Sequence, residues 1–142
     1  MIGVKPYIGF QGNCEEAFNF YRDCMGASVE GLLRYGDSPM AGNGNEDKIM
    51  HAVLRIGENI IMAADNVHPE NPVTVGNNIS MAIGVDTPED AESMFAKMSE
   101  GGRVTMPLQE TFWASRFGML TDKFGINWMF NCEKPHGSME GA

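Results

Sequence analysis

The sequence predicts an α+β fold built from two successive β-α-β-β-β modules. Short apolar runs bounded by turn residues indicate strands, and two segments with helical apolar spacing end at glycines. The same order of elements recurs, because Gly26 and Gly101, like Gly57 and Gly125, lie about 70 residues apart. One helix can cover only one face of a four-stranded sheet, so the other face of each mixed sheet must be buried elsewhere or curve around a ligand.

The first module is expected over residues 3–65. After a strand, Asn13 and Glu16 form a capping-box pattern at the start of a helix that Gly26 ends. A hairpin turn is expected at Gly57, between the last two strands. The expected strands of this module cover residues 6–10, 27–35, 49–56 and 60–64.

The second module is expected over residues 78–131. Thr87 and Pro88 predict the N-cap and first position of its helix. A turn is expected at residues 122–125, and a mobile, polar tail at 132–142. The expected strands cover residues 79–85, 103–110, 117–121 and 126–131.

Composition favours a single globular domain and excludes several classes of partner. The chain has 142 residues, of which 43% are hydrophobic and 20% charged, and its net charge is −9. Nucleic acid and anionic membranes require a basic surface, so neither is an expected partner. There is no apolar run long enough to span a membrane. Three cysteines without a CxxC pair indicate reduced thiols and a cytoplasmic location.

Aromatic, methionine and amide side chains concentrate in the segment 106–128, within a chain that has 12 methionines. Such side chains either fill a core or line a pocket for a small organic molecule. His51, in an otherwise apolar strand, is either a hydrogen-bonded core residue or a pocket acid or base. The candidate ligand-binding residues are Tyr35, His51, Met62, Gln109, Trp113, Met119, Trp128 and Met129.

Several short sequence segments resemble the PhnB-like branch of the vicinal oxygen chelate superfamily. This superfamily includes glyoxalases, bleomycin-resistance proteins and dioxygenases. The segments are residues 12–17 with Phe20-Tyr21, residues 34–40, residues 49–52 and residues 106–128. The resemblance covers about residues 3–131. It implies paired modules, a cupped sheet enclosing a pocket, and commonly a homodimer.

The resemblance also implies four metal-ligand positions, which metal-using members fill with His, Gln or Glu. Here they fall on Pro6, Met62, Ser80 and Met129. Proline, serine and two thioethers do not make a site for a hard divalent ion. His51, His68 and His136 show no metal-ligand spacing either. We therefore expect no metal and no cofactor.

Three functions remain open at this point. The first is a metal-free pocket that binds or sequesters a small molecule, in a homodimer. The second is a lyase, isomerase or dioxygenase of the superfamily with a relocated divalent metal, and the third is a protein-interaction module. The branch is sometimes labelled a methyltransferase, but no glycine-rich strand-to-helix turn is present to hold a nucleotide.

Overall fold

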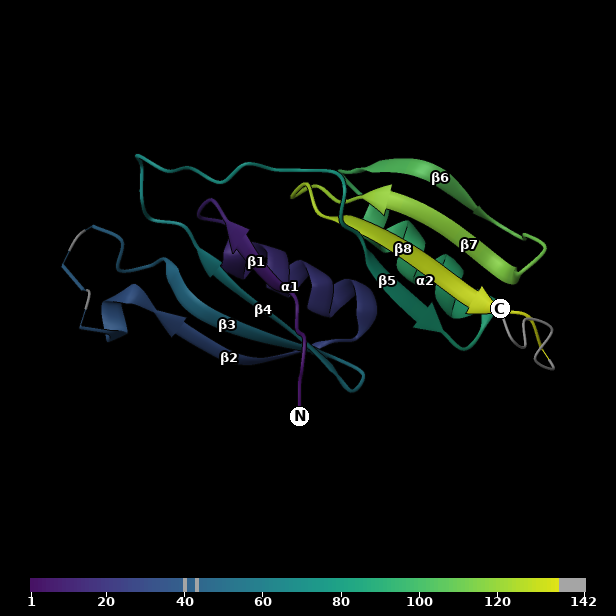
Figure 1. Cartoon of the computed structure of the whole chain (residues 1–142), viewed down its shortest axis with the longest axis horizontal. Helices are drawn as coiled ribbons and strands as arrows, with labels where there is room; N and C mark the ends of the chain where they lie inside the picture. Colours follow the sequence, from purple (N-terminus) through teal and green to yellow (C-terminus); the bar gives the residue numbers. More distant parts are fainter. Residues whose placement is uncertain (40, 43, 136–142) are drawn as a thin grey trace. The chain divides into compact units, whose positions relative to one another are not determined.

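The computed structural model describes residues 1–39, 41–42 and 44–135, and it confirms the predicted α+β fold. The chain divides into two compact units, Met1–Thr74 and Val75–Ala142. Each unit is a four-stranded mixed sheet with one helix packed against one of its faces (Figure 1). Within the described residues, no helix is long and apolar enough to cross a membrane.

The first unit follows the predicted β-α-β-β-β order. Its strands lie in the order β1-β4-β3-β2, and β1 pairs with β4 in parallel, whereas the other pairs are antiparallel. Gly57 has a positive φ of 59° in the two-residue turn between β3 and β4, as the hairpin prediction requires. The elements are β1 (Tyr7–Phe10), α1 (Cys14–Met25), β2 (Ser28–Arg34), the 3-10 turn η1 (Tyr35–Asp37), β3 (Ile49–Ile56) and β4 (Asn59–Asp65).

Helix α1 begins where predicted but is not capped as predicted. Asn13 occupies the N-cap position, yet its side chain makes no capping hydrogen bond. Instead, the Cys14 amide donates to Oδ1 of Asp65 at 2.9 Å. Asp65 lies 51 residues away at the end of β4, so a long-range contact replaces the local capping box.

The second unit repeats the topology, with strands in the order β5-β8-β7-β6 and β5 parallel to β8. The predicted N-cap of its helix is confirmed, because Thr87 Oγ1 accepts a hydrogen bond from the Asp90 amide at 3.0 Å and Pro88 follows it. The elements are β5 (Met81–Val85), α2 (Pro88–Ser99), β6 (Arg103–Gln109), β7 (Ala114–Thr121) and β8 (Asn127–Glu133).

Two strands of the second sheet are longer than predicted. β7 begins at Ala114 because Thr111 exchanges backbone and side-chain hydrogen bonds with Ala114 in a tight turn. This places Ala114 opposite Glu133, so β8 extends past residue 131 into the segment predicted to be a mobile tail. Residues 136–142, including His136, lie outside the described residues.

Burial alternates along the strands, and this fixes which face of each sheet carries the core. In β1 the buried residues are Ile8 and Phe10, and in β8 they are Trp128, Phe130 and Cys132. These side chains pack on the helix-covered faces. The residues between them therefore point to the opposite face of each sheet, which the helix of the same unit does not cover, and we call these the open faces.

Candidate functional site

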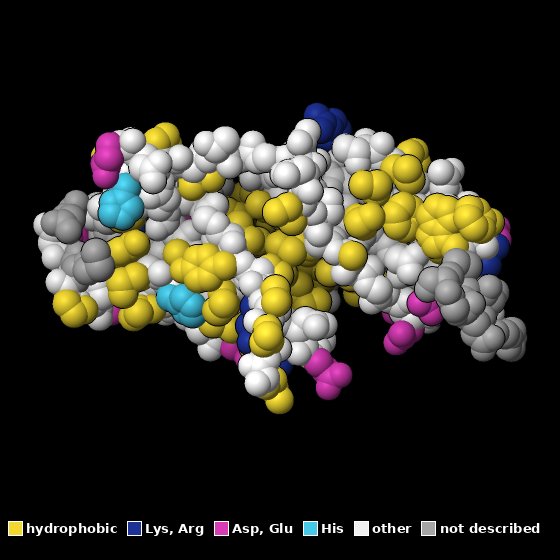
Figure 2. Space-filling model, in the orientation of Figure 1, with side chains coloured by type: hydrophobic (Ala, Val, Ile, Leu, Met, Phe, Trp, Pro, Cys, Tyr) yellow, Lys and Arg dark blue, Asp and Glu magenta, His cyan; other side chains and the backbone are white. Residues whose placement is uncertain are grey.

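The open face of the second sheet carries a row of methionines. Met106 in β6 is opposite Met119 in β7, and Met119 is opposite Met129 in β8. Ala82 in β5 follows Met129 in the same row. Met119 and Met129 are partly exposed, and Met106 is more exposed. Figure 2 shows apolar side chains at the surface of both units.

An aromatic group adjoins the methionine row. Phe117, two residues before Met119 on the same face of β7, contacts Trp113 edge-on, with 5.4 Å between ring centroids. Phe112, which is 82% exposed, packs edge-on against Trp113 at 4.9 Å. Gln109 lies opposite Phe117 across the β6–β7 pair. Three of the predicted residues, Gln109, Met119 and Met129, thus lie on the second sheet. Trp113, in the connection between β6 and β7, packs against Phe117 beside them.

Asn131 adds a polar group to this face. It lies opposite Phe117 in β7 and Gly84 in β5. Its Oδ1 atom is buried and is without a hydrogen-bond partner among the described residues. An open pocket of about 390 Å³ lies beside it, at the ends of β5 and β8. The pocket is lined by Gly84, Val85, Asp86, Asn131, Glu133, Lys134 and Pro135.

The open face of the first sheet brings together His51 and Met62. Met62 lies opposite Val53 in β3 and Tyr7 in β1. The rings of Tyr7 and His51 are 6.1 Å apart. Tyr7, which is 55% exposed, is not among the predicted site residues. The alternation of Tyr7 and Gly9 with the buried Ile8 and Phe10 was the signal that could have identified it.

Two predicted site residues lie elsewhere. Trp128 is fully buried on the helix-covered face, and its indole Nε1 donates to Oδ2 of Asp122 at 2.9 Å. It therefore points away from the side on which Met129 lies. The Tyr35 hydroxyl donates to the backbone oxygen of Asp65 at 3.4 Å and ties η1 to the end of β4. Both side chains contribute to the fold.

The four predicted ligand positions do not fit the divalent metal of the superfamily. Met62 in β4 and Met129 in β8 lie on the open faces, and Pro6 and Ser80 directly precede β1 and β5. None of these offers a carboxylate or imidazole ligand. In the part of the chain that the structure describes, no group of three or more His, Cys, Asp or Glu residues could hold a metal ion.

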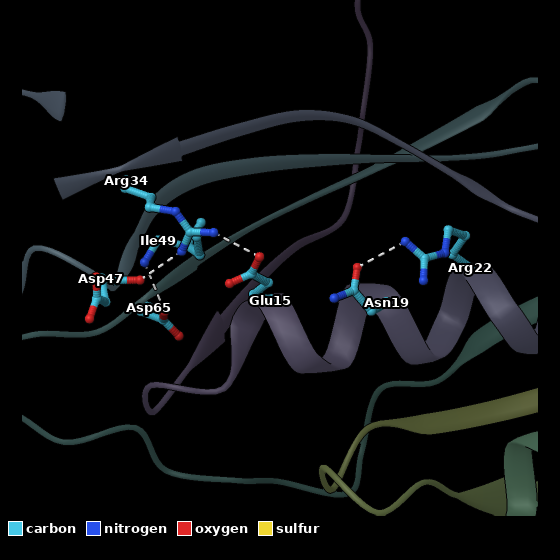
Figure 3. Close-up of polar contacts among 7 residues, drawn as sticks. All are labelled: Glu15, Asn19, Arg22, Arg34, Asp47, Ile49 and Asp65. Atoms are coloured by element: carbon cyan, nitrogen blue, oxygen red, sulfur yellow. Dashed lines mark hydrogen bonds and ion pairs between the residues drawn. The ribbon is translucent and has the colours of Figure 1, made fainter. Parts of the chain in front are cut away.

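Polar contacts in the first unit gather around the start of helix α1 (Figure 3). Arg34 donates to Oε2 of Glu15 at 2.8 Å and to the backbone oxygen of Asp47 at 2.9 Å. The hydrogen bond from Arg34 lowers the pKa of Glu15 below its ordinary value. Asp65 also accepts from the Ile49 amide at 2.9 Å. These contacts join β2, β3 and β4 to the helix, which is a structural role.

The buried thiol of Cys14 predicts a loss of stability at alkaline pH. Burial, and then the negative charges of Asp65 and Glu15, raise the pKa of Cys14 to about 12 from an ordinary 9.0. Above about pH 9 the unfolded chain can ionise this thiol, whereas the folded chain cannot until about pH 12. Stability should therefore fall across this window. The urea midpoint of the wild type should fall between about pH 8 and about pH 10.5. In Cys14→Ala, which lacks the thiol, this fall should be smaller. An equal fall in both proteins would contradict this assignment.

Comparison with known proteins identifies the family. Residues 7–130 match the family described as Glyoxalase/Bleomycin resistance protein/Dioxygenase superfamily. The chain belongs to this superfamily. Protein YjdN of Escherichia coli is 30% identical to it, over 92% of this chain and 95% of that protein. The vicinal oxygen chelate fold and the predicted resemblance are therefore confirmed.

Two solved structures are similar to this chain over most of its length, and one of them is named a PhnB protein. Protein PA1353 from Pseudomonas aeruginosa is 45% identical, with a TM-score of 0.85 over 94% of this chain and 98% of that one. A Bacillus cereus structure is named a putative 3-demethylubiquinone-9 3-methyltransferase, PhnB protein. It is 26% identical, with a TM-score of 0.76 over 92% of this chain and 99% of that one.

Proposed function

We propose that this PhnB-like protein binds or sequesters a small, largely apolar molecule without a divalent metal. In this role, residues 1–142 act as one domain of two modules, in a cytoplasmic homodimer. The observation that carries the proposal is the aromatic pair Trp113 and Phe117 beside partly exposed methionines. Soluble proteins seldom leave such a surface uncovered unless it binds something.

The chemistry of this face indicates the type of ligand. Aromatic edges and thioethers adapt to flat or irregular apolar groups. The Gln109 side chain, opposite Phe117, can donate or accept a hydrogen bond that orients the bound molecule. The open face of the first sheet, with His51 and Met62 beside Tyr7, supplies a second apolar surface of the same kind.

Methyl transfer receives no support from either strand-to-helix connection. Between β1 and α1 the chain reads Gln11-Gly12-Asn13, and between β5 and α2 it reads Asp86-Thr87. Neither is the glycine-rich turn that holds the nucleotide part of a cofactor in common methyltransferase folds. The name of the Bacillus cereus relative is therefore not extended to this chain.

A dye titration tests the proposed site. Nile red, an uncharged aromatic dye, should bind the full chain and bind Trp113→Ala about tenfold more weakly, because an aromatic wall is lost. Val104→Ala is the matched control, since Val104 lies opposite Leu120 and so points to the other face of the same sheet. Light scattering on the same preparation should show two copies of the chain.

Native mass spectrometry of the freshly purified protein provides the second readout. We expect a retained organic molecule of low mass that is lost on denaturation. Equal dye affinity in Trp113→Ala and Val104→Ala, together with no retained molecule, would contradict the proposal.

A further inference from the structure

Three methionines lie at neighbouring positions on one face of the second sheet. Met106, Met119 and Met129 occupy directly opposed positions on β6, β7 and β8, and we call them the methionine row. Side chains at opposed positions of neighbouring strands lie on the same face and in contact range. All three are accessible to solvent, and Met106 is 37% exposed.

A bulge in β6 completes the row. Val104 pairs with Leu120, but the next pair is Met106 with Met119, so Thr105 is an extra residue in the strand. With regular pairing Thr105 would lie opposite Met119. β-Bulges commonly redirect a side chain, and they are over-represented beside functional sites. The bulge therefore brings a third sulfur atom to a face that would otherwise carry two.

Thioether sulfur has a distinct preference among metal ions. It is neutral and soft, so it discriminates against hard cations such as Mg²⁺ and Ca²⁺ and favours Cu(I). Neighbouring strands lie about 4.8 Å apart, so the outer two Cα atoms of the row are about 10 Å from each other. Methionine has three rotatable side-chain bonds. The outer two side chains can therefore bend inward, and all three sulfur atoms can meet above Met119.

We propose that the methionine row binds one soft monovalent cation, Cu(I), through the sulfur atoms of Met106, Met119 and Met129. This goes beyond the proposed small-molecule function and does not depend on it. The small-molecule site is tested by dye binding to Trp113→Ala. Ion binding requires only the sulfur atoms of the methionine row. Because a thioether has no proton to lose, ion binding should not change with pH near neutrality.

Silver(I), an air-stable analogue of Cu(I), is the probe. The full chain is labelled with ¹³C at the methionine methyl groups and titrated with silver nitrate in chloride-free buffer. At one equivalent, the methyl resonances of the three row residues should shift. Those of Met62, on the first sheet, and Met98, fully buried in α2, should stay in place. This readout separates the row from the buried thiols Cys14, Cys24 and Cys132, which could also bind silver.

Leucine substitutions separate sulfur chemistry from apolar packing. Met119→Leu keeps the shape and hydrophobicity of the side chain and removes the donor atom. It should weaken silver binding about tenfold or more, whereas Met62→Leu should leave it unchanged. The silver titration follows the methionine methyl groups, whereas the dye titration follows the effect of Trp113→Ala, so failure of the ion site and failure of the small-molecule site are distinguishable. Absence of the methyl shifts, or equal silver affinity in both leucine variants, would overturn the proposal.

Discussion

Asp65→Ala is expected to destabilise the first module by about 3 to 5 kcal/mol. The carboxylate is 3% exposed and accepts two backbone hydrogen bonds at 2.9 Å, from Cys14 and from Ile49. Removing it leaves both amides buried without these acceptors. It also removes a negative charge from the N-terminus of α1, where the helix dipole favours one. The start of the helix would then lose its link to the end of β4.

Urea unfolding followed by far-UV circular dichroism measures this loss. Circular dichroism is needed because both tryptophans, Trp113 and Trp128, are in the second module. Asp65→Asn keeps one acceptor oxygen and should fall between the wild type and Asp65→Ala. The control is Asp23→Ala, because the Asp23 side chain is 69% exposed and should matter little. Equal midpoints for Asp23→Ala and Asp65→Ala would show that the carboxylate does not hold the helix.

Local patterns predicted the elements of the fold because each is set by neighbouring residues. The turn at Gly57 needs a positive φ, which glycine adopts without strain. The N-cap at Thr87 needs only a side-chain hydroxyl that can accept a hydrogen bond from the backbone amide three residues later, at Asp90. That amide lies in the first turn and has no carbonyl acceptor within the helix. Such signals recur in both halves of the chain, so the two-module order was readable from the sequence alone.

Contacts between distant residues could not be read in this way. The side chain that caps α1 comes from Asp65, and local spacing favoured Asn13 and Glu16 instead. In the candidate site, the bulge at Thr105 determines that Met106 lies opposite Met119, and bulges leave no reliable mark in a single sequence. The methionine row was therefore visible only after the strands were paired.

Trp128 differs, because a usable signal was present. Trp128, Phe130 and Cys132 alternate with Met129 and Asn131 at the two-residue period of a strand. This pattern puts Trp128 and Met129 on opposite faces, so the two cannot line the same side of the sheet. Composition drew attention to the tryptophan as a pocket residue. Its buried hydrogen bond to Asp122 shows that it holds the β7–β8 hairpin instead.

Gly102 packs against the turn of this hairpin, at Thr121 and Asp122. Gly102→Ala should therefore destabilise the second module by about 2 to 4 kcal/mol. A Cβ atom at Gly102 would overlap the backbone oxygen of Thr121, and it would lie 2.9 Å from the Cα atom of Asp122. These are backbone atoms, so no side-chain rotation relieves the contact. The outcome depends on whether the backbone at Asp122 can move.

Three hydrogen bonds resist that movement. Asp122 accepts from the amides of Phe124 and Ile126 through Oδ1 and from the indole of Trp128 through Oδ2. A shift of the Asp122 backbone would disturb the buried side chain of Trp128. Gly102→Ala should therefore change the tryptophan emission of the folded protein and also lower the urea midpoint. Gly84→Ala is the matched control, because a Cβ atom there meets nothing within 4 Å. In a strand this change should be neutral or slightly stabilising. Equal urea midpoints for Gly102→Ala and Gly84→Ala would show that the backbone at Asp122 can move at little cost. They would contradict the conclusion that its hydrogen bonds hold the hairpin in place.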